Sequence, residues 1–137
     1  MAASDWTDHV AGTSELVRLF QGPPPLADLD LLGLLIDERP DSAVTLGFTT
    51  THVPGAPESP AFEDGMNALE FFLVFSDIRG LEIAGWEHTG LRRYEISQVG
   101  AGSLNVSMTG DSSHISFSAG SCRVEGLRAY RAAVDSM

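Results

Sequence analysis

The chain has 137 residues, 43% of them hydrophobic, and a formal net charge of −11 with no lysine. This length and composition predict a single domain over residues 1–137 with a real core, and exclude a chain that is disordered throughout. Phosphate binding needs a basic surface, so nucleic acid and anionic membranes are not expected as partners. Residues 1–90 carry 15 acids and only 3 arginines, which allows a basic protein partner, although net negative charge also simply keeps a protein soluble.

No apolar run reaches the roughly 20 residues that a membrane-spanning helix needs, and the first residues have no signal-peptide pattern. Cys122 is the only cysteine, which excludes an intramolecular disulfide and is typical of a reducing compartment. We therefore expect a cytoplasmic protein. Cys122 is expected to be a small apolar residue on a strand face rather than a catalytic thiol.

The first elements in chain order are a loose arm, a helix and a strand. Residues 1–12 are predicted to form a loose N-terminal arm that Trp6 could anchor. Residues 13–22 predict a short helix, because Thr13 or Ser14 can cap its start and a glycine follows its last turn. Three prolines then force an extended stretch, and the alternation of apolar residues over 26–37 predicts a strand.

In the rest of the chain, apolar and polar residues alternate over short stretches, which predicts short strands joined by tight turns. A loop of about 17 residues, rich in proline, separates the second strand from the third. The apolar residues at 69–75 point to both faces, which predicts a central strand, and we expect it to turn into a hairpin with 81–84. The further predicted strands are 44–49, 91–98, 104–109, 114–119 and a last one from Cys122; the final residues allow either a longer strand or a helical turn.

These elements predict a mainly β (α+β) fold. We expect an antiparallel sheet of about eight strands with one short N-terminal helix. The spacing of the strands along the chain is compatible with a meander, a sandwich or an open barrel, and it does not distinguish among these three.

The sequence lacks the motifs that carry catalysis or cofactor binding. The four histidines are far apart, and there is no HxH, HExxH, CxxC or glycine-rich phosphate loop. We therefore predict no catalytic residues, no metal and no cofactor. The acids are better candidates for contact with a basic partner: Asp37, Glu38 and Asp41 in one turn, and Glu58, Glu63 and Asp64 in the long loop.

A second interpretation is a small-molecule-binding barrel. Its basis is a set of aromatic residues at alternating strand positions, although such residues are more often plain core. The set consists of Phe71, Phe72, Phe75, Trp86, Tyr94 and Phe117.

Four segments resemble the immunity protein 50 family of bacterial polymorphic toxin systems. They are LFQGPPPLADLDLLGLLID at 19–37, VTLGFTT at 44–50, NALEFFLVFSDIRGLEIAGW at 67–86 and HISFSAGSCRVEGLRAYR at 114–131. The likeness runs from about residue 14 to residue 131. The chain departs from it at AFEDGMN, where the family often has a tryptophan before its asparagine and this chain has only Phe62.

The resemblance implies a non-enzymatic inhibitor. Such a protein is made beside a secreted toxin and binds the toxin domain, which protects the producing cell. The family brings no catalytic residues that could be assigned to this chain.

Overall fold

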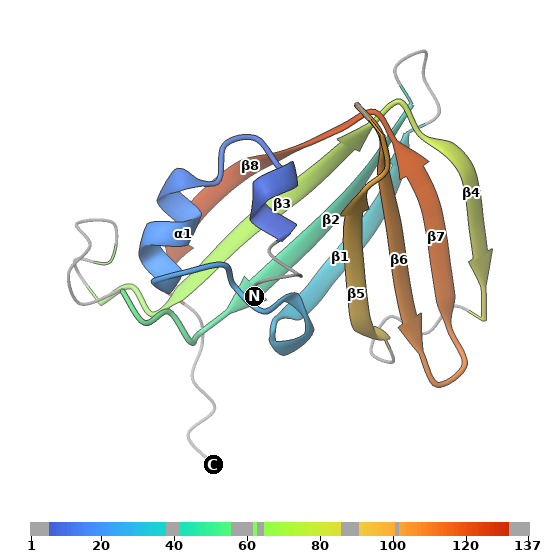
Figure 1. Ribbon diagram of the computed structural model, residues 1–137. Coiled ribbons are helices and arrows are strands. Elements are labelled where there is room, and N and C mark those ends of the chain that lie inside the picture. Colours follow the sequence, from blue (N-terminus) through green and yellow to red (C-terminus); the bar gives the residue numbers. More distant parts are fainter. Residues whose placement is uncertain are drawn as a thin grey trace.

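The computed structural model describes residues 6–37, 42–55, 62, 65–85, 91–100 and 102–131. Within these residues, eight strands form two antiparallel sheets of four strands each, accompanied by one short α-helix (Figure 1). The predicted mainly β fold is confirmed, and the two sheets do not close into a barrel.

The elements have the following bounds. Sheet A contains, in spatial order, β1 (Asp30–Asp37), β2 (Ala43–Thr50), β3 (Ala68–Ser76) and β8 (Ser121–Tyr130). Sheet B contains β4 (Arg79–Ala84), β7 (His114–Ala119), β6 (Leu104–Gly110) and β5 (Leu91–Gln98). The helical elements are the 3-10 turn η1 (Trp6–His9), the helix α1 (Ser14–Phe20) and the 3-10 turn η2 (Leu26–Asp28).

Strand β2 shows the alternation that builds the core. Val44, Leu46 and Phe48 are fully buried, whereas Thr45 and Thr49 on the opposite face of the strand are only half-buried. Successive side chains of a strand point to opposite faces, so one face of the sheet is covered and the other is more open. Strands β6 and β7 alternate in the same way, which confirms the strands predicted there.

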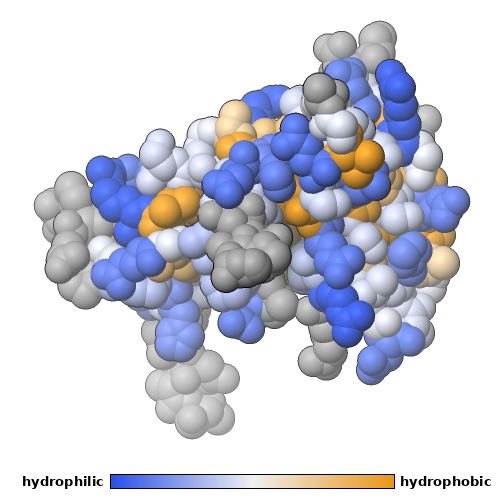
Figure 2. Space-filling model, viewed as in Figure 1, coloured by the Kyte–Doolittle hydropathy of each residue, from blue (hydrophilic) through white to orange (hydrophobic). Residues whose placement is uncertain are grey.

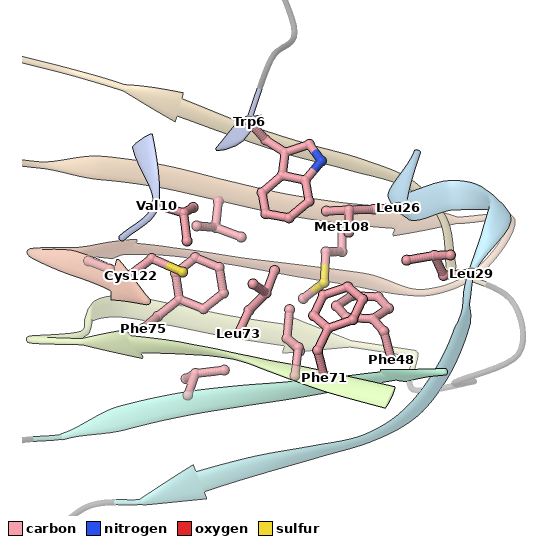
Figure 3. Close-up of a cluster of buried hydrophobic side chains, with 14 of the residues drawn as sticks. Trp6, Val10, Leu26, Leu29, Phe48, Phe71, Leu73, Phe75, Met108 and Cys122 are labelled. Carbon is pink, nitrogen blue, oxygen red and sulfur yellow. The ribbon is translucent and has the colours of Figure 1, made fainter. Parts of the chain in front are cut away.

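Both sheets and the N-terminal segments contribute to the hydrophobic core, where their side chains point toward one another (Figure 3). The ring of Phe75 in β3 meets Phe117 in β7 edge-on with centroids 5.2 Å apart, and Phe48 in β2 meets Tyr94 in β5 at 5.7 Å. The buried leucines of α1 belong to the same core. Helix α1 and sheet B therefore cover the same face of sheet A, which we call the inner face (Figure 1).

The prediction that segments 69–75 and 81–84 form a hairpin is wrong. Strand β3 lies in sheet A between β2 and β8, whereas β4 pairs with β7 in sheet B. The chain returns from sheet B to sheet A at Gly120, whose N–H donates to the carbonyl oxygen of Ser76 at 2.8 Å. The two points where the chain changes sheets thus lie side by side, and this corner holds the sheets together.

The predicted strand 26–37 is correct only from residue 30. Residues Leu26–Asp28 form the turn η2 instead. There Leu26 packs on the core, and η2 lies against β5. A β-bulge between Leu31 and Gly33 then shifts the register. As a result Leu31 and Leu35, expected on one face, lie on opposite faces of sheet A.

Part of the predicted loose N-terminal arm is packed. The Trp6 indole is buried and its N–H donates to the carbonyl oxygen of Pro24 at 2.8 Å. Val10 joins the core, and Ala11 forms a parallel bridge with Arg123 at the edge of β8. Residues 1–5 of the arm lie outside the described residues.

Two further predictions concern the last strand and the loop before β3. Strand β8 continues to Tyr130, so the final described segment is a strand rather than a helical turn. Phe62, which stands near the position of the family's tryptophan, is half-buried against the core.

Candidate functional site

Sheet A has an outer face that lies opposite the inner face. Sheet B, α1, η1 and η2 all contribute side chains to the core on the inner face. The view from the α1 side shows a mainly hydrophilic surface with separate hydrophobic patches (Figure 2). In the part of the chain that the structure describes, the outer face keeps several large apolar side chains exposed to solvent.

The outer face carries an open apolar groove over β1, β2 and β3. It has a volume of about 310 Å³ and is lined by Leu32, Gly33, Leu34, Leu35, Thr45, Gly47 and Phe72. Leu32 is 50% exposed and Leu35 is 62% exposed, the largest value among the big hydrophobic residues described. Exposed apolar side chains that gather in one place are typical of an interaction surface.

Gly47 and Gly126 make room for the aromatic ring in this groove. A methyl group added at Gly47 would come within 2.8 Å of the Phe72 ring, and one added at Gly126 would also come within 2.8 Å of it. The ring therefore lies across the sheet between β2 and β8. Phe72 is half-buried, and forms a fixed wall of the groove rather than part of the core.

Charged side chains lie on both sides of the groove. On the β8 side they are paired, since Arg128 donates to Glu70 at 2.7 Å and Arg123 contacts Glu125. Both arginines and Glu125 are solvent-exposed whereas Glu70 is mostly buried, and within each pair the two charges cancel. On the β1 side an acid stands at each end of the strand, Asp30 and Asp37. The apolar part of β1 is thus bracketed by two carboxylates.

The outer face of sheet B has a different character. Register pairs Ser107 with Ser116, and Asn105 with Ser118, on this face. These side chains are short and polar, in contrast to the exposed leucines of β1. Interface centres are rich in aromatic and aliphatic side chains, so sheet A offers the better candidate.

Only one of the six acids predicted to bind a partner lies in the described part of the chain. Asp37 ends β1 next to the groove and is half-buried. The other five, Glu38, Asp41, Glu58, Glu63 and Asp64, lie outside the described residues.

Sequence reasoning missed the groove itself. The signal was the run of five leucines and isoleucines in DLLGLLID, which are more than one face of an edge strand needs.

Most of the aromatic set is core. Phe71, Phe75, Tyr94 and Phe117 make ring contacts inside the molecule. Phe72 lines the open groove, and Trp86 lies outside the described residues.

Cys122 is unsuited to nucleophilic chemistry. It is buried in the core beside Phe75 of the neighbouring strand. Burial raises the pKa of its thiol to about 12, although the nearby charge of Arg123 opposes this shift. A thiol with so high a pKa is almost entirely protonated near pH 7, and the thiolate is the reactive form.

In the described residues, no group of three or more His, Cys, Asp or Glu residues could hold a metal ion. No described helix is long and apolar enough to cross a membrane.

Comparison with known proteins gives one result. The sequence model of the family Immunity protein 50 matches residues 12–130, which is most of the chain. The chain belongs to the Immunity protein 50 family. Comparisons with curated proteins and with solved structures gave no significant match. In this family member, the outer face of sheet A combines exposed apolar side chains with an open groove, as far as the described residues show.

Proposed function

We propose that this chain is an immunity protein that binds a cognate toxin domain and neutralises it by protein–protein contact. The observation that carries the proposal is the family match over residues 12–130. In this proposal the chain is bacterial and not an enzyme, and it acts in the cytoplasm on a toxin that is made beside it.

Two physical features support a protein partner. The outer face of sheet A combines an apolar groove with a polar surround, which is the usual anatomy of a protein interface. The net charge of −11 favours a basic toxin domain, because opposite charges speed encounter and suppress wrong partners.

Co-expression tests the proposal directly. The toxin domain encoded next to this gene is induced in a bacterial host, alone and together with this chain. We expect growth to stop with the toxin alone and to recover when the chain is present. Cell death despite soluble, folded chain would refute toxin neutralisation.

The control separates binding from a general effect on expression. The toxin level is measured by immunoblot in both cultures, and the two purified proteins are mixed and passed over a gel-filtration column. We expect equal toxin levels and a common peak. Recovery of growth with a lower toxin level and no complex would also contradict the proposal.

A further inference from the structure

We propose that β1 and the groove on the outer face of sheet A form the surface that docks the toxin. The occupant would be a basic protein segment that places an apolar side chain in the groove and positive groups near Asp30 and Asp37. This inference rests on the proposed function and adds to it the binding surface and the chemistry of the partner.

The shape and polarity of the groove suit it to bind a large apolar side chain. Its walls are the exposed leucines of β1 and the ring of Phe72, and Gly47 keeps its floor open. A volume of about 310 Å³ accommodates one or two large side chains. Interfaces gain most of their affinity from a few large side chains that fill such pockets at their centre.

The charge at the ends of β1 favours a basic protein over a second copy of this chain as the occupant of the groove. An antiparallel pairing of β1 with a second β1 about its midpoint would set Asp30 of one copy opposite Asp37 of the other. A parallel pairing in register would set each acid opposite itself. Like charges directly opposite are destabilising, and each copy also carries a net charge of −11.

A basic partner avoids this repulsion. Positive side chains that flank an apolar one would match the acid–apolar–acid order along β1, where Asp30 is exposed and Asp37 is half-buried. On the opposite side of the groove, the arginines of β8 are already paired with Glu70 and Glu125. This pairing reduces their repulsion of a cationic partner. The geometry therefore favours a basic protein over self-association.

The test measures the affinity of the purified, catalytically inactivated toxin domain encoded beside this gene. The variants are Leu35→Arg in β1 and, as matched control, Ile83→Arg in β4. Both residues are exposed apolar positions on edge strands, at 62% and 42%, and both variants change the net charge equally. We expect Leu35→Arg to weaken binding at least about tenfold and Ile83→Arg to change it less than about threefold.

A second variant tests the charges without adding bulk. The double substitution Asp30→Asn with Asp37→Asn should lower the association rate and flatten its dependence on salt. The control Glu82→Gln with Glu95→Gln removes two acids from sheet B and should leave more of that dependence intact. Urea unfolding of every variant shows that it is folded at the temperature of the binding measurement.

The outcomes separate the two proposals. Absence of binding by the wild-type chain would refute the proposed function, and this inference with it. Wild-type binding that Leu35→Arg and the double amide variant both leave unchanged would overturn the docking surface alone. Sedimentation that shows a wild-type dimer, dissociated by Leu35→Arg with toxin binding intact, would also overturn it, because a second copy would then occupy the face.

Discussion

At the scale of the residue, Phe72 shows how one side chain shapes a surface. It belongs to the segment predicted as buried on both faces, and Val74 beside it is indeed buried. Phe72 instead stays half-exposed and spans the two glycines opposite it, Gly47 and Gly126. An aromatic ring over a strand glycine restores packing that the glycine itself cannot provide.

Substitution at Gly126 should therefore destabilise the fold. Gly126 has a φ of +65° and an added methyl would collide with the Phe72 ring, so we expect Gly126→Ala to lower the free energy of unfolding by about 1–3 kcal/mol. Gly33→Ala is the control, since an added methyl there meets nothing within 4 Å. Urea denaturation measures both. Equal effects of the two substitutions would contradict the role given to the ring.

The buried thiol predicts a dependence of stability on alkaline pH. The pKa of Cys122 is about 12 in the folded chain, against 9.0 for a free thiol. Between these values the unfolded thiol releases its proton and the folded thiol keeps it, so stability falls as pH rises, by up to about 1.4 kcal/mol per pH unit. Cys122→Ala should show a shallower decline from pH 8.5 to 10.5 in urea titrations. Parallel curves for the two proteins would exclude this linkage.

At the scale of the element, local pattern predicted most strands and missed their partners. Val44, Leu46 and Phe48 alternate in the sequence and alternate in burial, because the period of a strand follows from its backbone. The partner of β4 depends on contacts between distant segments, which no local pattern contains. The bulge at Gly33 likewise depends on how β1 pairs with β2.

The candidate site was predictable only in part, for the same reason. Asp37 was named from its charge and its place near a turn, and its contact with a partner stays a prediction. The groove requires knowledge of which face of sheet A the core covers, and that is decided by sheet B and α1. Leu32 and Leu35 are large apolar residues, yet both are exposed in the structure.

The turn η1 should stabilise the whole core. Trp6 is buried and hydrogen-bonded to Pro24, so we expect Trp6→Ala to cost about 3–5 kcal/mol in the free energy of unfolding. Trp6→Phe keeps most of the packing but leaves the Pro24 carbonyl without its donor, and should cost about 1–3 kcal/mol. Thermal unfolding followed by circular dichroism measures both. A value near zero for Trp6→Ala would mean that the N-terminal segment is not part of the core.

At the scale of the whole molecule, contacts between the sheets should make unfolding cooperative. Phe75 and Phe117 belong to different sheets and touch edge-on. A double-mutant cycle with Phe75→Leu and Phe117→Leu should give a coupling of about 0.5–1.5 kcal/mol. Guanidine unfolding of the four proteins supplies the values. Strictly additive effects would show that the two sheets do not support each other at this point.

The bridge at Ala11 has a consequence for assembly. Molecules with an open sheet can join edge to edge into a long ribbon only if both edge strands of that sheet have unpaired backbone groups. Ala11 exchanges backbone hydrogen bonds with Cys122 and Val124 and so occupies part of the β8 margin of sheet A. This contact leaves less of the β8 margin open to a strand from another molecule.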